Sequence, residues 1–144
     1  MSHWLDDALV AVPYAQFLGV RLIWQDGAPI GLLPYREELI GVPTPPALHG
    51  GVSLAFLEVT ALATLMQATA GQMAETTGAQ PLEWPRTIDL SVDYLRPGLQ
   101  LDAYARARIT RAGRRYATLS VAAWQEDESR PFAQAIGHFL MPEV

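Results

Sequence analysis

Cysteine and lysine are absent from this chain of 144 residues. Without cysteine the chain can form no disulfide, no thiolate nucleophile and no cysteine-based zinc site. Its ten basic residues are therefore all arginine, and 15 acidic residues bring the net charge to −5. An acidic chain that lacks a basic stripe interleaved with aromatic side chains does not favour a nucleic-acid partner. We therefore expect none.

Histidine is rare as well, and its three copies, His3, His49 and His138, are far apart in the sequence. They lack the spacing of metal ligands, so we expect no metal site. The N-terminus has no basic segment ahead of an apolar run, which argues against a secretory signal. The apolar segment at residues 52–68 contains one charge and two threonines, and we expect it to fall short of a membrane span. These absences predict a cytoplasmic protein without a membrane partner.

The length of the chain favours one domain spanning residues 1–144. Half of the residues are hydrophobic, which allows a substantial core, although a small domain still gains from oligomerising. Loose apolar spacing predicts one or two short helices within residues 4–18. An Asp-Gly pair then forms a strong hairpin signal between two strands, at residues 20–24 and 29–33.

A proline-rich segment at residues 41–48 predicts a stiff loop, and a long apolar helix follows from about residue 50 to about residue 73. Four strands joined by short turns complete the chain. The first three alternate apolar and polar residues, and the last is apolar on both faces. We expect these strands at residues 88–94, 99–109, 117–124 and 132–141.

Short turns imply that neighbouring strands pair antiparallel. A single apolar helix is buried only if that sheet wraps around it. Small residues in the strands, such as Ala105 and Ala135, suit close contact between helix and sheet. The pattern therefore predicts an α+β fold, with an antiparallel sheet of about six strands around one long central helix.

The chemistry of the chain concentrates in the segment that opens the long helix. His49, Gly50 and Gly51 stand at its start, and Glu58 follows nine residues after the histidine. Glu58 is the only charge within residues 52–68, and an ionised carboxylate is costly to bury unless it has partners. A helix N-terminus made of glycines offers free backbone N–H groups and a positive dipole end. A carboxylate and donors for a developing oxyanion are the parts needed for acyl chemistry.

This segment resembles the hotdog-fold thioesterases, in particular the PaaI-like acyl-CoA thioesterases. Two further stretches look like parts of the same family: residues 88–98, which contain Tyr-Leu-Arg-Pro, and residues 14–20 at the entry to the first strand. The resemblance covers roughly residues 13–141. It implies a hotdog fold, acyl-CoA as the substrate, no cofactor beyond the CoA thioester itself, and assembly as a homodimer or homotetramer.

The resemblance also implies a role for each residue of the motif. Glu58 would act as general base or nucleophile on the thioester, and the Gly50 backbone N–H would bind the thioester carbonyl oxygen. His49 and Gly51 would shape the site beside the ligand. In the family, the acid and the glycine of one site come from opposite subunits, so the dimer would be the smallest active unit.

The chain departs from the family pattern at two positions. Pro43 stands where many relatives carry Asn or Gln, and Thr44 could take over that polar role. Leu62 stands where relatives that use Glu can carry Thr. The site would then hold its water with another group, act slowly or be inactive. Arg96 is a candidate contact for the phosphates of CoA, because arginine suits bidentate phosphate binding.

Three functions remain open at this point. The spacing of the histidine, the glycines and the acid favours an acyl-CoA thioesterase. A hotdog dehydratase or hydratase would use a histidine with an acid, generally at a different spacing. A non-catalytic acyl-CoA binding protein stays open because Pro43 replaces a polar residue. Release of free thiol from acyl-CoA would separate turnover from saturable binding alone.

Overall fold

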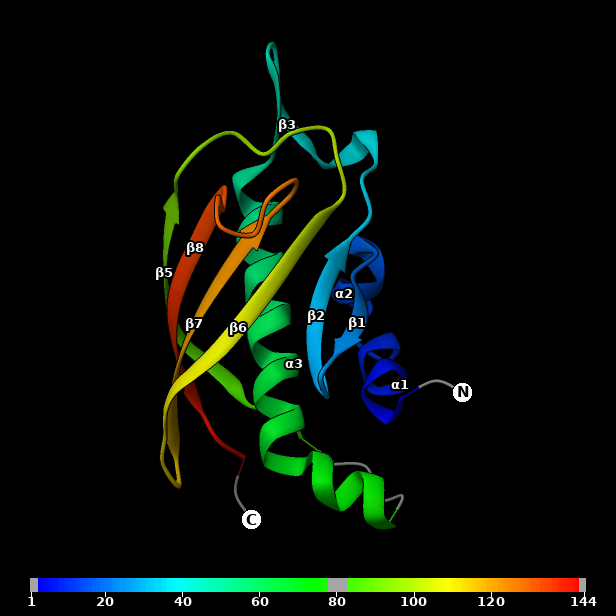
Figure 1. Cartoon of the computed structure of the whole chain (residues 1–144), viewed down its shortest axis with the longest axis vertical. Helices are drawn as coiled ribbons and strands as arrows, with labels where there is room; N and C mark the ends of the chain where they lie inside the picture. Colours follow the sequence, from blue (N-terminus) through cyan, green and yellow to red (C-terminus); the bar gives the residue numbers. More distant parts are fainter. Residues whose placement is uncertain (1–2, 78–82, 143–144) are drawn as a thin grey trace.

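The computed structural model describes residues 3–77 and 83–142, with side chains for residues 3–71 and 83–142. One long helix lies against a sheet, and two short helices lie beside the first two strands (Figure 1). In chain order the elements are α1 (Trp4–Val10), α2 (Pro13–Leu18), β1 (Arg21–Gln25), β2 (Ala28–Leu33), the 3-10 turn η1 (Glu37–Leu39), β3 (Ile40–Pro43), β4 (Pro46–Leu48), α3 (Gly50–Thr77), β5 (Arg86–Tyr94), β6 (Ala103–Ala112), β7 (Tyr116–Trp124) and β8 (Ala133–Leu140).

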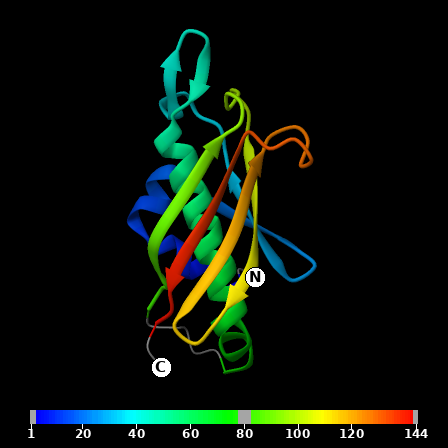
Figure 2. The same ribbon diagram turned by 90° about the vertical axis from the view of Figure 1, so that its left-hand side faces the viewer.

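The main sheet has six strands in the order β1-β2-β6-β7-β8-β5. Every neighbouring pair in it is antiparallel. The helix α3 packs along one face, as two views at right angles agree (Figures 1 and 2). The α+β architecture predicted from the sequence, about six antiparallel strands around one central helix, is confirmed.

The alternation of β8 positions the core and corrects one expectation. Its residues alternate strictly between buried and exposed, with Ala135 and Phe139 facing the core. Ile136 on the opposite face is 54% exposed. The strand was expected to be apolar on both faces, but its outer face also carries Gln134 and His138. This face is exposed because α3 covers only the other side of the sheet.

Small residues allow α3 to lie close to the sheet. A Cβ atom at Gly31 of β2 would overlap the Thr60 hydroxyl, so glycine is required at this crossing. Thr60 is fully buried, and its hydroxyl donates to the Phe56 carbonyl at 2.9 Å. Because that bond satisfies the hydroxyl within the helix, the polar side chain can be buried at little cost.

Two boundaries around α3 differ from the expectation. Residues 41–48 belong to the hairpin of β3 and β4 and not to a loop, and this hairpin stands out from the body in Figure 1. Proline is tolerated on edge strands, where its missing N–H costs no ladder bond. The helix runs to Thr77 and not to residue 73. A single glycine costs a helix only about 1 kcal/mol relative to alanine, so Gly71 does not end it.

The strand β6 begins at Ala103, four residues later than expected. The side-chain amide of Gln125 accounts for this difference. Its oxygen accepts from the Leu99 N–H at 2.8 Å, and its nitrogen donates to the Leu99 carbonyl at 2.8 Å. The peptide groups of Leu99 are therefore paired with a side chain, and the strand ladder starts after them.

By length and composition alone, the first 22 residues of α3, Gly50–Gly71, could cross a membrane. The expectation that this segment falls short of a span was therefore wrong on those criteria. In the folded chain the same residues form the central helix, and half of the most apolar window is buried against the rest of the protein. The apolar composition of α3 is accounted for by its contacts with the sheet and with α1.

Candidate active site at the start of the central helix

Three segments converge on the residue before α3. The His49 N–H donates to the Leu39 carbonyl at 2.9 Å, and the Leu48 N–H donates to the Gly98 carbonyl at 3.0 Å. A Cβ atom at Gly41 would come within 2.7 Å of the His49 Cα atom, so only glycine lets the hairpin base pass this close. The helix start is therefore held by long-range contacts as well as by its own sequence.

The side chain of His49 caps the first turn of α3. Its Nδ1 atom accepts from the Gly51 N–H at 2.8 Å, and its carbonyl accepts from Val52 at 3.0 Å and from Ser53 at 3.1 Å. Four N–H groups at a helix start have no partner within the helix. Within the part of the chain that the structure describes, the Gly50 N–H is the one of these four that donates to no acceptor. It is free to bind an oxygen from outside the chain.

Tyr94, the last residue of β5, completes this cluster. Its hydroxyl donates to the Gly50 carbonyl at 2.8 Å, although 44 residues separate the two in the sequence. A Cβ atom at Gly50 would lie 3.3 Å from the Tyr94 hydroxyl oxygen and 3.4 Å from its ring. Tyr94 was not among the site residues expected from the sequence. Its place in the Tyr-Leu-Arg-Pro stretch was the available signal.

Glu58 lies on the same helix as Gly50, about 12 Å further along the axis. It shares one face of α3 with Gly51, Ala55 and Leu62, since these residues follow one another at spacings of four and three. All four positions are exposed or half-buried, so Glu58 is only half-buried although it lies in a largely apolar helix. Across the described residues, its carboxylate has no hydrogen bond and no ion pair.

The neighbours of α3 in the fold account for which of its residues are buried. The helix lies between the β5 edge of the sheet and the pair α1 and α2, as Figures 1 and 2 agree. Residues of α3 that point at the sheet or at α1, such as Phe56, Leu57 and Met66, are almost fully buried. The half-buried Glu58 therefore lies on a part of the helix surface that the described elements cover only partly.

Thr44 and Arg96, the other two candidates, do not join this cluster. Thr44 is exposed in the turn between β3 and β4. Arg96 donates to the Pro131 carbonyl at 2.7 Å and lines a cleft of about 490 Å³ with Asp127 and Arg130. Hydrogen bonds from the hydroxyl and the N–H of Ser129 hold the pKa of Asp127 below its usual range. The structure brings together His49, Gly50 and Gly51, but not these two.

A family profile described as the thioesterase superfamily matches residues 46–132, more than half of the chain. The chain belongs to the thioesterase superfamily. It is 31% identical over 122 residues to the medium/long-chain acyl-CoA thioesterase YigI of Salmonella typhimurium, a match that covers 81% of this chain and 78% of that protein.

Solved structures of other proteins share the fold of this thioesterase-superfamily chain. A phenylacetic acid degradation-related protein of Ralstonia eutropha superposes with a TM-score of 0.73 at 18% identity, covering 96% of this chain and 99% of that one. A Bacillus halodurans protein solved with CoA superposes with a TM-score of 0.69 at 19% identity, covering 93% and 82%. The hotdog fold and the family resemblance stated from the sequence are confirmed by these matches.

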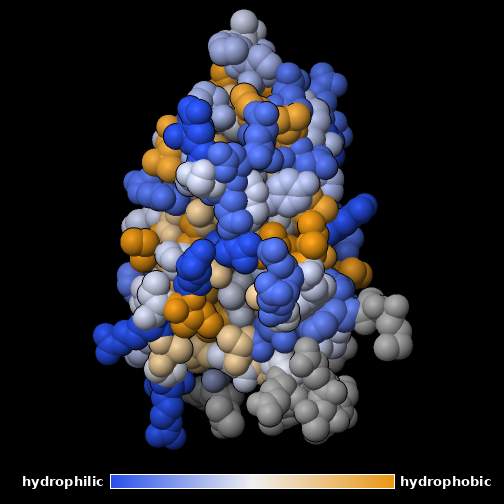
Figure 3. All heavy atoms as spheres, viewed as in Figure 1, coloured by the Kyte–Doolittle hydropathy of each residue, from blue (hydrophilic) through white to orange (hydrophobic). Residues whose placement is uncertain are grey.

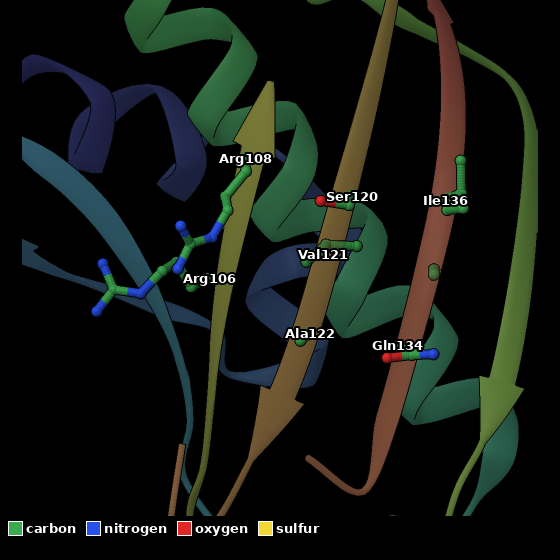
Figure 4. A pocket seen from close by; sticks show the side chains of 8 residues that line it. Arg106, Arg108, Ser120, Val121, Ala122, Gln134 and Ile136 are labelled. Atoms are coloured by element: carbon green, nitrogen blue, oxygen red, sulfur yellow. The ribbon is translucent and has the colours of Figure 1, made fainter. Parts of the chain in front are cut away.

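A second cleft, of about 250 Å³, lies on the outer face of the main sheet (Figure 4). Arg106 and Arg108 of β6 border it together with Gln134 and Ile136 of β8. Arg106 is paired with Glu128 at 2.6 Å. In the view of Figure 3, apolar and charged side chains are interspersed and form no single apolar patch. The sheet separates this cleft from α3, so it is not part of the site at the helix start.

Proposed function

We propose that this protein hydrolyses an acyl-CoA thioester to a carboxylic acid and free CoA. The observation that carries the proposal is that α3 holds two polar groups without a partner among the described residues, the Gly50 N–H and the Glu58 carboxylate. The curated relative is an acyl-CoA thioesterase, and a protein of the same fold was solved with CoA. Both findings support CoA thioesters as the substrate class.

In the proposed reaction, the Gly50 N–H donates to the thioester carbonyl oxygen and stabilises the negative charge that develops there. Backbone donors fixed in advance are effective because they need no reorganisation during the reaction. In one route, Glu58 takes a proton from water, whose oxygen attacks the carbonyl carbon; the carbon–sulfur bond then breaks, and the departing thiolate takes up that proton. In the other route, Glu58 attacks the carbon itself and the carbon–sulfur bond breaks, which leaves an acyl–Glu58 anhydride. Water then hydrolyses the anhydride to the carboxylic acid and supplies the proton that the thiolate takes up.

One chain cannot present both groups to the same thioester. The Gly50 N–H and the Glu58 side chain are about 12 Å apart along one helix axis, whereas the reacting carbon and oxygen are directly bonded. We therefore propose that Gly50 of one protomer acts with Glu58 of the partner subunit. The smallest active unit is then a dimer, and assembly into a tetramer would repeat the same site.

The β5 strand supplies a surface for such a dimer. It is an edge strand, and its Ile88 and Tyr94 side chains are 52% and 56% exposed. Edge strands present unpaired backbone groups that a second copy can bind. Tyr94 is level with Gly50, and about 12 Å corresponds to about four strand residues, so Leu90 is about level with Glu58. A two-fold axis near Val92 therefore brings Gly50 of each protomer toward Glu58 of the partner subunit.

Charge on the outer face of β5 favours the same register. An axis at Val92 places Ser91 opposite Asp93 of the partner subunit. An axis one residue earlier, at Ser91, would place Asp89 opposite Asp93 of the partner subunit, and like charges directly opposite each other are destabilising. The charges on β5 and the spacing along α3 thus both favour a two-fold axis at Val92.

Because the chain has no native cysteine, single cysteines test this register without background. We expect Val92→Cys to form a disulfide-linked dimer under mild oxidation, since directly opposed residues in an antiparallel pair have Cα atoms about 4.5–5.5 Å apart. Leu90→Cys is the matched control, because its two copies would be too far apart to link. A disulfide in Leu90→Cys with none in Val92→Cys would contradict the proposed pairing of two β5 strands about Val92.

A non-catalytic acyl-CoA binding protein is the second candidate. Pro43 offers no polar side chain, and Thr44 is exposed at the hairpin turn, so neither position supplies an evident group to hold water. A screen of acyl-CoA thioesters with thiol detection decides between the two. Turnover that depends on Glu58 supports the thioesterase, whereas saturable binding without thiol release supports the binding protein.

The geometry at His49 argues against the hydratase alternative. Its Nδ1 atom already accepts from the Gly51 N–H, so a neutral His49 carries its proton on Nε2. A ring in this state has no free basic nitrogen to remove a proton from a carbon chain. We therefore propose that His49 organises the helix start and takes no part in proton transfer.

A further inference from the structure

Tyr94 contacts the backbone of Gly50 but has no role in the reaction as proposed above. Its hydroxyl donates to the Gly50 carbonyl at 2.8 Å from the end of a different element, the edge strand β5. The Tyr94 side chain is otherwise 56% exposed, so it contributes little to the core. A solvent-exposed tyrosine that bonds the backbone of the residue carrying the free N–H calls for a physical explanation.

The helix start needs external support because it consists of two glycines. Glycine has the largest conformational freedom of any residue, and its immobilisation costs the most backbone entropy. His49 holds the pair from one side by accepting from the Gly51 N–H. Tyr94 holds it from the other side through the Gly50 carbonyl, and its ring lies where a Cβ atom at Gly50 would make contact. Gly50 is thus held on both sides while its own N–H stays free.

We propose that Tyr94 is a positioning residue, whose hydroxyl and ring fix the direction in which the Gly50 N–H meets the thioester oxygen. This inference rests on the proposed thioesterase function. It explains why a bond to the carbonyl of Gly50 matters to a reaction that uses the N–H of the same residue: both groups move with the Gly50 backbone. A misplacement of about 1 Å can cost on the order of a hundredfold in rate.

The hydroxyl and the ring have separable roles. If Tyr94 only packed the end of β5, Tyr94→Phe would keep the ring and change nothing in the reaction. If the hydroxyl fixes the oxyanion donor, its removal weakens an interaction that is strongest in the transition state. Such a loss lowers kcat and kcat/KM together and leaves KM unchanged.

The test compares Tyr94→Phe with Tyr116→Phe. Tyr116 is an exposed tyrosine at the start of β7, 59% accessible, and its hydroxyl makes no hydrogen bond with any described residue. We expect Tyr94→Phe to lower kcat about tenfold, less than the loss from removing a donor outright, with KM, melting temperature and dimer content unchanged. Tyr116→Phe should match the wild type in all four measurements.

A readout without substrate accompanies the kinetics. In the free protein we expect the Gly51 amide, which donates to His49, to exchange with solvent faster in Tyr94→Phe than in the wild type, because one restraint on the glycine pair is gone. Amides at the β6–β7 turn should exchange at the wild-type rate.

The outcomes that overturn the inference are distinct from failure of the proposed function. An active wild type with an unchanged kcat in Tyr94→Phe removes the role of Tyr94 and leaves the thioesterase standing. A loss of activity that only follows a lower melting temperature or a lower dimer content shows a structural role instead. A wild type that releases no thiol from any acyl-CoA removes the thioesterase, and the reaction-based role of Tyr94 with it.

Discussion

The two candidate site positions on α3, the helix start at Gly50 and the carboxylate of Glu58, differ in how the chain holds them. At the helix start, His49, Gly50 and Gly51 are bound by the hairpin base, by the loop at Gly98 and by Tyr94, and one N–H remains free. Eight residues later, Glu58 is half-buried and has no partner among the described groups. Contacts within the chain thus fix the Gly50 backbone, whereas no described group of the chain binds the Glu58 carboxylate.

Because of this difference, we expect substitutions at the two positions to affect folding stability and reaction rate differently. Changes at the helix start should alter both the local structure and the rate, because each residue there makes contacts within the chain. Changes at Glu58 should alter the rate alone, because its removal breaks no hydrogen bond or ion pair of the described chain. Substitutions at the two positions can therefore test whether the contrast is real.

The largest effect is expected from Glu58→Ala. General acid–base catalysis by a positioned side chain typically contributes 10²–10⁴-fold, so thioester hydrolysis should fall by about that factor. The melting temperature should stay the same or rise, because a half-buried charge without a partner is removed. Steady-state thiol release and thermal unfolding measure both effects. Glu37→Ala in the exposed 3-10 turn is the matched control, and near-normal turnover in folded Glu58→Ala would remove Glu58 from the mechanism.

The next effect is expected from Gly50→Val. A side chain there would press on Tyr94, at 3.3 Å for the first added carbon, and would crowd the thioester at the free N–H. We expect a loss of about 10²–10³-fold, the range found for removal of an oxyanion donor. Unlike Glu58→Ala, this variant should also melt at a lower temperature. Gly113→Ala, at a turn where a Cβ atom meets only an ordinary contact, is the control.

The smallest effect is expected from His49→Ala. It removes a helix cap, which typically costs about 1 kcal/mol of stability, and leaves the Gly50 N–H in place. The rate should fall only severalfold, while the melting temperature drops. His49→Asn restores a side-chain acceptor and should recover most of the loss. If His49→Ala is inactive while Gly50→Val is active, the imidazole is the catalytic group. The proposed contrast between the helix start and Glu58 would then be wrong.

The sequence by itself determined the long helix, the six strands of the main sheet and their order, because their signals are local; it missed the hairpin of β3 and β4, whose prolines indicate a loop. The alternation of β5 and β7 and the apolar run of α3 each depend on neighbours a few residues away. Spacing along one helix likewise placed Gly50 and Glu58 about two turns apart, which follows from the helix period. The resemblance, and not the spacing, identified the fold and implied a site shared between subunits.

Only the tertiary structure decided how the site is held. The Tyr94–Gly50 bond joins residues 44 positions apart, and the need for glycine at Gly41 appears only when the hairpin base lies against His49. The half-buried state of Glu58 depends on which face of α3 the sheet leaves uncovered. A local pattern cannot predict these contacts, because each depends on two distant segments being packed at a distance of a few ångströms.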